Sequence, residues 1–206
     1  MTTILKINSS IYSDAGQSSQ LAAQFVDALL EREPGARVIE RDLAREPIPH
    51  LDAARFQAFL TKPEERTAEQ QAVAGFSDGL IDELRRADVV VLGVPMYNYG
   101  IPTQLKAWFD HIARAGVTFK FTDQGAVGLL TGKKVYVFAT RGGAHAGTAR
   151  DSQTAHVREF LGLLGMNEVE FTYAEGLAMG AEARDTSLAQ ARAALQNLAP
   201  PVRLAA

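Results

Sequence analysis

A short stretch with two tyrosines, a methionine, an asparagine and a glycine has the residue types to bind a flat ring: M-Y-N-Y-G over Met96–Gly100. It follows Val89–Val94, an apolar run without alternation, which is typical of a strand buried on both faces of a parallel sheet. In open α/β sheets, ligands bind at the carboxyl ends of the strands. Aromatic rings exposed at that edge favour a planar ligand. The alternative is a tyrosine-rich turn that packs on the next helix, which Pro102 and Thr103 begin.

A second candidate stretch, Ser9–Ser19, is rich in hydroxyl groups and small residues. It follows a predicted strand over Ile4–Asn8 and precedes a predicted helix whose apolar residues recur at helical spacing. The N-terminus of a helix presents free N–H groups and a partial positive charge, so it can bind a phosphate without a basic residue. Simple capping of the helix by a serine is the alternative. The candidate phosphate-binding side chains are Ser10, Gln17, Ser18 and Ser19.

A third stretch, T-R-G-G-A-H-A-G over Thr140–Gly147, follows a predicted strand over Val135–Ala139. Its two adjacent glycines offer backbone N–H donors that no side chain obstructs. His145 lies in the same loop, where it could supply a polar or proton-donating group; a solvated loop histidine is the alternative. The histidines of the chain have no metal-ligand spacing, so we expect no metal site.

Strand and helix patterns alternate along the chain, with further strands predicted over Arg37–Asp42 and Val169–Tyr173. This alternation favours a doubly wound α/β fold with a sheet of five parallel strands. If the first strand lies centrally, the order is 2-1-3-4-5, and the loops after strands one, three and four meet at one edge. A phosphate end, an aromatic platform and a glycine-rich wall of backbone donors then surround one flat cofactor, a description that fits FMN.

Two segments interrupt the alternation. Leu43–Thr67 contains three prolines and is too long for a simple connection, so we expect a surface excursion with a short helix over Ala53–Leu60, serving as a lid or a partner contact. Val117–Leu130 alternates, turns and alternates again, which predicts a small hairpin. Thr67–Gln70 is a capping-box pattern for the helix that leads to the central strand.

Composition limits the class of protein. With 206 residues the chain can bury one core, and we expect a single domain over residues 1–206. A net charge of −3 with dispersed Lys and Arg gives no reason to expect nucleic acid or an anionic membrane as partner, so the partner is a small molecule. The absence of cysteine excludes disulfides and thiolate sites. The first residues form no leader pattern and no apolar run reaches membrane-spanning length, so we expect a cytoplasmic protein.

Familiar nucleotide and hydrolase motifs are missing. No G-x-G-x-x-G follows a strand, and Thr131–Lys134 lacks the upstream glycine and the Ser or Thr of a P-loop. No G-x-S-x-G elbow is present either. These absences argue against nucleoside triphosphate binding and against a serine hydrolase.

Four groups of residues are shared with a known family. They are Ser9-Ser10 with Gly16-Gln17-Ser18, Pro95-Met96-Tyr97-Asn98-Tyr99, Ala115-Gly116-Val117-Thr118-Phe119, and Thr140-Arg141-Gly142-Gly143 with His145. Over nearly its whole length the chain resembles the FMN-dependent NADH-azoreductases, which are homodimeric, flavodoxin-like quinone and azo reductases. The resemblance implies that the first group holds the FMN phosphate, the second cradles the ring and ribityl chain, and the last borders the ring's polar edge.

Three positions depart from this family. Its members often have Phe at the position of Tyr99, Tyr at that of Phe121 and Phe at that of Leu163. The resemblance implies that these residues face the substrate, with Phe121 contributed across a dimer interface. The departures therefore affect the expected range of substrates and leave the expected cofactor unchanged.

The implied reaction is ping-pong. NADH or NADPH passes a hydride to FMN and leaves, and a quinone or an aromatic azo compound then takes the hydride in the same place. The cofactor carries the chemistry, so no acid or base residue is obligatory, and His145 is an auxiliary candidate. The backbone N–H groups of Gly142 and Gly143 are the natural donors to the negative charge of reduced flavin. The alternative is a flavodoxin-like electron carrier without its own turnover, for which a net charge of −3 is weak.

Overall fold

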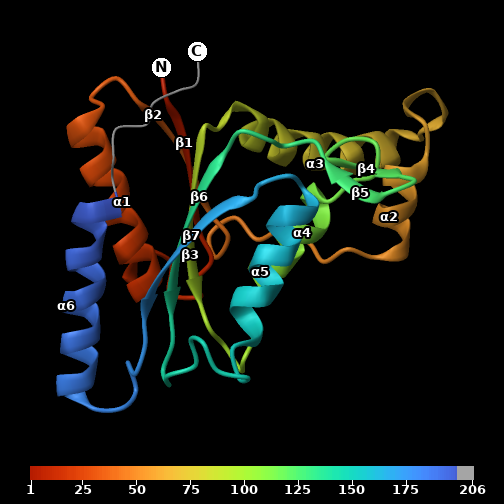
Figure 1. Cartoon of the computed structure of the whole chain (residues 1–206). Helices are drawn as coiled ribbons and strands as arrows, with labels where there is room; N and C mark the ends of the chain where they lie inside the picture. The colour runs from red at the N-terminus through yellow and green to blue at the C-terminus, as the bar shows by residue number, and fades with distance from the viewer. Residues whose placement is uncertain (199–206) are drawn as a thin grey trace.

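A computed structural model describes residues 1–198, with a five-stranded parallel sheet at the centre (Figure 1). In spatial order, the strands are β2 (Arg37–Asp42), β1 (Thr3–Asn8), β3 (Val89–Pro95), β6 (Lys134–Thr140) and β7 (Glu168–Ala174). This agrees with the predicted order 2-1-3-4-5, because strands β4 and β5 belong to a separate hairpin.

Strand register brings the carboxyl ends of the strands level with one another. Asn8 pairs with both Asp42 and Gly93, and Thr140 pairs with both Pro95 and Ala174. The loops after β1, β3, β6 and β7 therefore leave the sheet at the same edge, as doubly wound topology requires.

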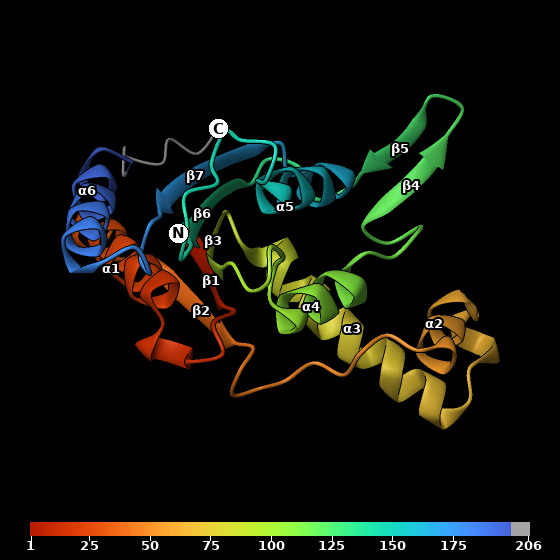
Figure 2. The ribbon, with the colours of Figure 1, turned by 90° about the horizontal axis from the view of Figure 1, so that it is seen from below.

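Helices cover both faces of the sheet (Figure 2). One face carries α1 (Gln17–Arg32) and α6 (Ala181–Leu198), and the other carries α3 (Ala68–Arg86), α4 (Thr103–Ile112) and α5 (Ser152–Leu163). Along β3, Val89 and Val91 belong to the core under α1 and α6, whereas the intervening Val90, Leu92 and Val94 belong to the other core. Burial on both faces explains why this strand shows no polar alternation.

Two excursions leave the layered body on the same side of the molecule (Figure 2). Between β2 and α3, the chain forms α2 (Ala53–Leu60) and the 3₁₀ turn η2 (Pro63–Glu65), as predicted for part of Leu43–Thr67. After α4, β4 (Phe119–Thr122) and β5 (Gly125–Gly128) form the predicted antiparallel hairpin. A further 3₁₀ turn, η1 (Ser13–Ala15), precedes α1.

Helix ends follow local hydrogen bonding. The Thr67 hydroxyl and the Gln70 side chain form both bonds of the predicted capping box at the start of α3. Helix α4 ends at Ile112, because the Thr118 hydroxyl donates to the Ile112 carbonyl at 2.7 Å and accepts the Arg114 N–H at 2.9 Å. These bonds replace the next helical turn with the bend that leads into the hairpin.

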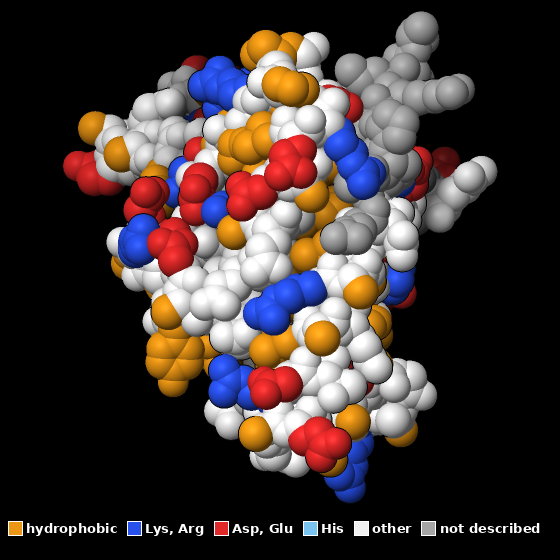
Figure 3. Space-filling view, turned by 90° about the vertical axis from the view of Figure 1, so that its left-hand side faces the viewer, with side chains coloured by type: hydrophobic (Ala, Val, Ile, Leu, Met, Phe, Trp, Pro, Cys, Tyr) orange, Lys and Arg blue, Asp and Glu red, His pale blue; other side chains and the backbone are white. Residues whose placement is uncertain are grey.

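The outer face of α1 and α6 mixes acidic, basic and apolar side chains without an extended area of one charge (Figure 3). Within residues 1–198, no helix combines the length and the apolar character needed to cross a membrane.

Candidate functional site

Nearly all of the predicted cofactor residues line one or the other of two cavities at the carboxyl edge of the sheet. One has a volume of about 180 Å³ and is lined by Ser10, Tyr12, Gly16, Gln17, Pro95, Met96, Tyr97, Thr140, Arg141, Gly142 and Leu177. The other, of about 380 Å³, is lined by Met96, Asn98, Tyr99, Gly142, Gly143 and His145. Met96 and Gly142 border both, so the two cavities are neighbours at this edge.

Helix α1 points its first turn at the smaller cavity. Its N-cap is Gly16, which makes no capping bond through a side chain, so the predicted alternative of a serine cap is wrong. The N–H groups of the first turn, Gln17 to Ser19, have no acceptor within a helix. A Cβ on Gly16 would lie 2.2 Å from the Ser10 hydroxyl oxygen, so only glycine fits at position 16 beside Ser10.

Ser18, a predicted phosphate-binding residue, lines neither cavity. Its side chain is fully buried, and its hydroxyl oxygen has no hydrogen-bond partner among the described residues. The Ser19 hydroxyl is likewise buried without a partner. A buried hydroxyl without a partner costs about 1–3 kcal/mol. A bound phosphate at this helix terminus would supply the missing acceptor, and the donor set of this turn fits such a group.

The loop after β3 makes a tight turn. Tyr97 and Gly100 exchange two backbone hydrogen bonds, of 3.1 and 3.0 Å, and the two residues between them have positive φ: 49° at Asn98 and 65° at Tyr99. Two-residue turns of this kind normally use Asn-Gly. A tyrosine in this conformation costs about 1–3 kcal/mol, and such strain concentrates at functional sites.

Both tyrosines of this loop contact other loops of the site. The Tyr97 hydroxyl lies 3.3 Å from the Ser10 hydroxyl and accepts the Ile11 N–H at 3.3 Å. The ring of Tyr99 is 53% exposed, and its centroid lies 5.2 Å from that of His145. The alternative of a turn that packs on its own following helix therefore does not describe this loop.

The loop after β6 presents unpaired backbone donors. The carbonyls of Arg141, Gly142 and Gly143 accept the N–H groups of Leu177, Ala178 and Gly176, respectively. In contrast, the N–H groups of Gly142 and Gly143 have no acceptor in the described part of the chain. Neither glycine has a positive φ, so backbone conformation does not require glycine here. A Cβ on Gly143 would lie 2.8 Å from the His145 ring, so the close approach of this ring explains the glycine at position 143.

Arg141 lines the smaller cavity, but its guanidinium is fully buried and engaged. It pairs with Asp151 at 2.8 Å and with Glu175 at 3.0 Å, and it donates to Gln153 and Thr154. Burial alone would raise the pKa of the Asp151 carboxyl, but hydrogen bonds from Arg141 and Thr154 lower this pKa below its ordinary value. Arg141 thus holds loops together instead of offering its charge to a ligand.

Only one of the three predicted substrate residues lies at the cavities of a single chain. Tyr99 lines the larger cavity, whereas Phe121 and Leu163 line neither cavity of a single chain. Phe121 projects from β4 with 75% of its surface exposed, and Leu163 packs against the core under α3, α4 and α5. Among residues 1–198, no group of three or more acidic or histidine side chains could hold a metal ion.

The sequence interpretation missed two lining residues, Tyr12 and Leu177. Tyr12 lies inside the predicted phosphate loop. Leu177 follows β7, and its backbone N–H donates to the Arg141 carbonyl at 3.1 Å. The position of the fifth strand's carboxyl end at the same edge was the signal that could have identified it.

Comparisons with known proteins agree with this arrangement. A family model described as a flavodoxin-like fold matches residues 2–199. The FMN-dependent NADH:quinone oxidoreductase of Cellvibrio japonicus (strain Ueda107) is 53% identical over 192 residues, which cover 93% of this chain and 96% of that protein. The chain belongs to the family of FMN-dependent NADH:quinone oxidoreductases. Another member, from Burkholderia thailandensis, is 54% identical over 95% of this chain and 98% of its own length.

Solved structures of the same architecture include azoreductases. An azoreductase from Bacillus anthracis strain Sterne superposes with a TM-score of 0.85 at 25% identity, covering 96% of this chain and 100% of that chain. An FMN-dependent NADH-azoreductase from Bacillus anthracis strain Ames Ancestor, solved in complex with FMN, shares the fold with a TM-score of 0.85 at 24% identity, covering 97% of this chain and 100% of that one. The flavodoxin-like architecture of this member of the quinone oxidoreductase family is thus found in flavin enzymes.

Proposed function

We propose that this protein is an FMN-dependent oxidoreductase that transfers a hydride from NADH or NADPH to quinones and aromatic azo compounds. The observation that carries the proposal is a pair of neighbouring cavities with unpaired donors at their two far ends. At one end are the first turn of α1 and the buried hydroxyl of Ser18, and at the other are the N–H groups of Gly142 and Gly143. The names of the relatives support the same cofactor and acceptor.

The residues around this site fit the parts of FMN. Ser10, Gly16, Gln17 and Ser18 would hold the phosphate, since a helix N-terminus favours a dianion without a basic side chain. The loop from Pro95 to Tyr99 would hold the ring and ribityl chain, and Thr140, Arg141, Gly142, Gly143 and His145 would border its polar edge. When bound, FMN accepts a hydride from the nicotinamide and later releases it to the acceptor.

The protein's own contribution is positional and electrostatic. The free N–H groups of Gly142 and Gly143 would stabilise the negative charge that develops along the polar edge of the ring. The exposed ring of Tyr99 offers a flat face to a planar substrate beside the site. No acid or base side chain is obligatory for quinone reduction, and His145 would serve as an auxiliary polar group.

We further propose that the protein is a homodimer with shared active sites. Phe121 is 75% exposed, Val127 43% and Leu129 42%, so the hairpin presents apolar surface that a second copy would cover. Phe121 would then complete the substrate pocket of the partner, and Leu163 would also line a substrate pocket. We also propose that residues 1–206 form a single domain that acts in the cytoplasm.

The dimer is tested by changing Phe119 to Asp together with Phe121 to Ser. Mass by light scattering and quinone turnover should fall together over a range of protein concentrations. A well-folded monomer with undiminished turnover would refute the shared site. A dimer that loses only bulky aromatic substrates would place Phe121 in the pocket wall and the interface elsewhere.

The function is tested by mixing the protein, FMN, NADH and a quinone without air. We expect prompt loss of NADH that requires both the protein and FMN. An electron carrier would instead bind FMN and leave NADH unconsumed. Azo cleavage to two amines requires two hydride transfers and quinone reduction one, so NADH consumed per acceptor should be twofold higher with azo compounds.

A further inference from the structure

Gln153 is a buried amide that connects two walls of the site. It lies in the first turn of α5 with 1% of its surface exposed and lines neither cavity. Its Nε2 donates to the Pro95 carbonyl at 2.9 Å and lies 3.5 Å from the Gly100 carbonyl, and its Oε1 accepts from the Arg141 Nε at 3.3 Å. One side chain therefore touches both ends of the loop after β3 and the residue that begins the loop after β6.

The loop after β3 needs such a support. Its two central residues, Asn98 and Tyr99, hold a strained positive φ, and strained backbone persists only where its surroundings fix it. The Gln153 side chain donates to the carbonyls of Pro95 and Gly100, which lie on either side of the strained pair. The neighbouring Ser152 hydroxyl donates to the Tyr99 carbonyl. Consecutive residues of α5 thus hold three carbonyls of one loop.

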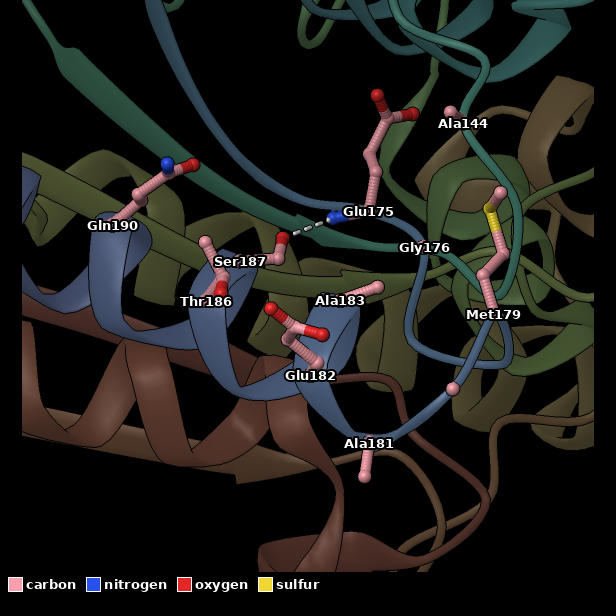
Figure 4. A pocket seen from close by; sticks show the side chains of 11 residues that line it. Ala144, Glu175, Gly176, Met179, Ala181, Glu182, Ala183, Thr186, Ser187 and Gln190 are labelled. Atoms are coloured by element: carbon pink, nitrogen blue, oxygen red, sulfur yellow. Dashed lines mark hydrogen bonds between the residues drawn. The ribbon is translucent and has the colours of Figure 1, made fainter.

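The other half of the connection runs through Arg141. Its buried guanidinium reaches the Glu175 carboxylate, which also accepts the N–H groups of His145 and Ala146 at 2.8 and 2.9 Å. Glu175 is anchored from α6, because its own N–H donates to the Ser187 hydroxyl at 2.9 Å, while its carboxylate points away from that helix (Figure 4). Gln153 therefore lies between the turn of Tyr99 and the loop of Gly142, Gly143 and His145.

We propose that Gln153 is a positioning residue of the FMN reaction: its amide fixes the strained turn from Tyr97 to Gly100 at a set distance from the loop of Gly142 and Gly143. The inference rests on the proposed function for the identity of the cofactor. Its physical basis is that an amide donates and accepts at once, which neither a carboxylate nor an apolar side chain of similar size can do. Mispositioned walls weaken binding and catalysis because a displacement of about 1 Å costs of the order of 100-fold in rate.

Two variants distinguish the hydrogen bond to the Pro95 carbonyl from the hydrogen bond with the Arg141 Nε. Gln153→Leu removes both of these bonds. Gln153→Glu keeps an acceptor for the Arg141 Nε but brings a carboxylate against the Pro95 carbonyl, to which it cannot donate. Ser77→Ala is the matched control, because the buried Ser77 hydroxyl also donates to a distant backbone carbonyl, that of His111 at 2.6 Å, and lines neither cavity.

The experiment measures three quantities for each variant: amide hydrogen exchange at Tyr97 and Gly100 in the apoprotein, FMN affinity by titration, and the absorption spectrum of bound FMN. Both Gln153 variants should exchange at least tenfold faster at these two amides, bind FMN at least tenfold more weakly, which is about 1.4 kcal/mol, and shift the spectrum. Ser77→Ala should lower thermal stability and leave all three quantities unchanged.

Particular results overturn the inference. If Gln153→Leu loses stability as Ser77→Ala does but keeps the wild-type exchange, affinity and spectrum, Gln153 is merely structural. If Gln153→Glu behaves like the wild type, the donor to Pro95 has no positioning role. Should Gln153→Leu fail to fold, Gln153→Glu decides alone. A wild-type protein without affinity for FMN would refute the proposed function, whereas normal wild-type affinity with unaffected variants refutes only this inference.

Discussion

Replacing Ser18 by alanine should change the stability of the apoprotein and the affinity for FMN in opposite directions. The hydroxyl is fully buried and lacks a partner in the described chain, so the apoprotein bears its desolvation cost without a compensating bond. Replacement by alanine recovers part of that cost, because it leaves no buried hydroxyl without a partner. In contrast, a hydrogen bond to a charged phosphate contributes about 1.5–3 kcal/mol to binding.

These magnitudes give measurable effects. We expect the apoprotein of Ser18→Ala to be as stable as the wild type or more stable by about 0.5–1 kcal/mol, which raises the Tm of a chain of this length by about 1–4 °C. FMN binding should weaken about 10- to 150-fold, since 1.4 kcal/mol corresponds to a factor of ten. Riboflavin, which lacks the phosphate, should bind the variant and the wild type equally.

The assay combines thermal unfolding of the apoprotein with titration of FMN and riboflavin. Ser77→Ala is again the control: it removes a buried helical hydroxyl that does have a partner, so its apoprotein should lose about 1–3 kcal/mol with no change in FMN affinity. An apoprotein of Ser18→Ala destabilised by more than 1 kcal/mol would show that the hydroxyl has a structural partner. Unchanged FMN affinity would remove Ser18 from the phosphate site.

Three further changes test other parts of the site and fold. Gly93→Ala should weaken the binding of FMN more than that of riboflavin in paired titrations. A Cβ at this position would lie 3.0 Å from the backbone of the first turn of α1, and such overpacking costs about 1–3 kcal/mol. An equal loss of affinity for both ligands would contradict this prediction. Tyr99→Gly should stabilise the apoprotein by about 1 kcal/mol, because glycine relieves the strain at a φ of 65°. It should also raise the KM for quinones. A lower Tm would show that the contacts of the tyrosine ring outweigh the strain. Acidification from pH 7 to pH 5 should lower the free energy of unfolding. Burial, together with the nearby charge of Arg55, lowers the pKa of His111 in the folded protein. The unfolded chain therefore takes up a proton near pH 6.5 that the folded chain does not. The Tm of His111→Gln should depend less on pH over this range, and an equal dependence would exclude His111 as the cause.

The sheet and the location of the site could be predicted from the sequence because the signals are local. An apolar run without alternation, followed by a polar or aromatic loop and an amphipathic helix, recurs along the chain, and parallel topology brings the ends of such strands to one edge. The position of Gly16 and Gln17 at a helix N-terminus and of Tyr99 beside His145 follows from that topology.

Other features depend on contacts between distant residues. The buried environment of Arg141 arises from Asp151, Gln153 and Glu175, which come from distant parts of the chain, so the local sequence could not show that its charge is engaged within the protein. The positive φ of Tyr99 opposes the ordinary preference of tyrosine, and tertiary bonds maintain it. Helix α1 is capped by Gly16 instead of a serine, at a position where Ser10 leaves no room for a Cβ, and composition alone could not indicate this close approach.

The proposed ping-pong mechanism requires that this chain pass a hydride through FMN in two separate half-reactions. The most direct measurement is a single-turnover experiment without air, in which the FMN-loaded protein is mixed first with NADH and, after removal of the nicotinamide, with a quinone. We predict that NADH alone bleaches the flavin absorption and that the quinone alone then restores it. Bleaching that requires both substrates together, or NADH oxidation that proceeds without FMN, would rule out this mechanism.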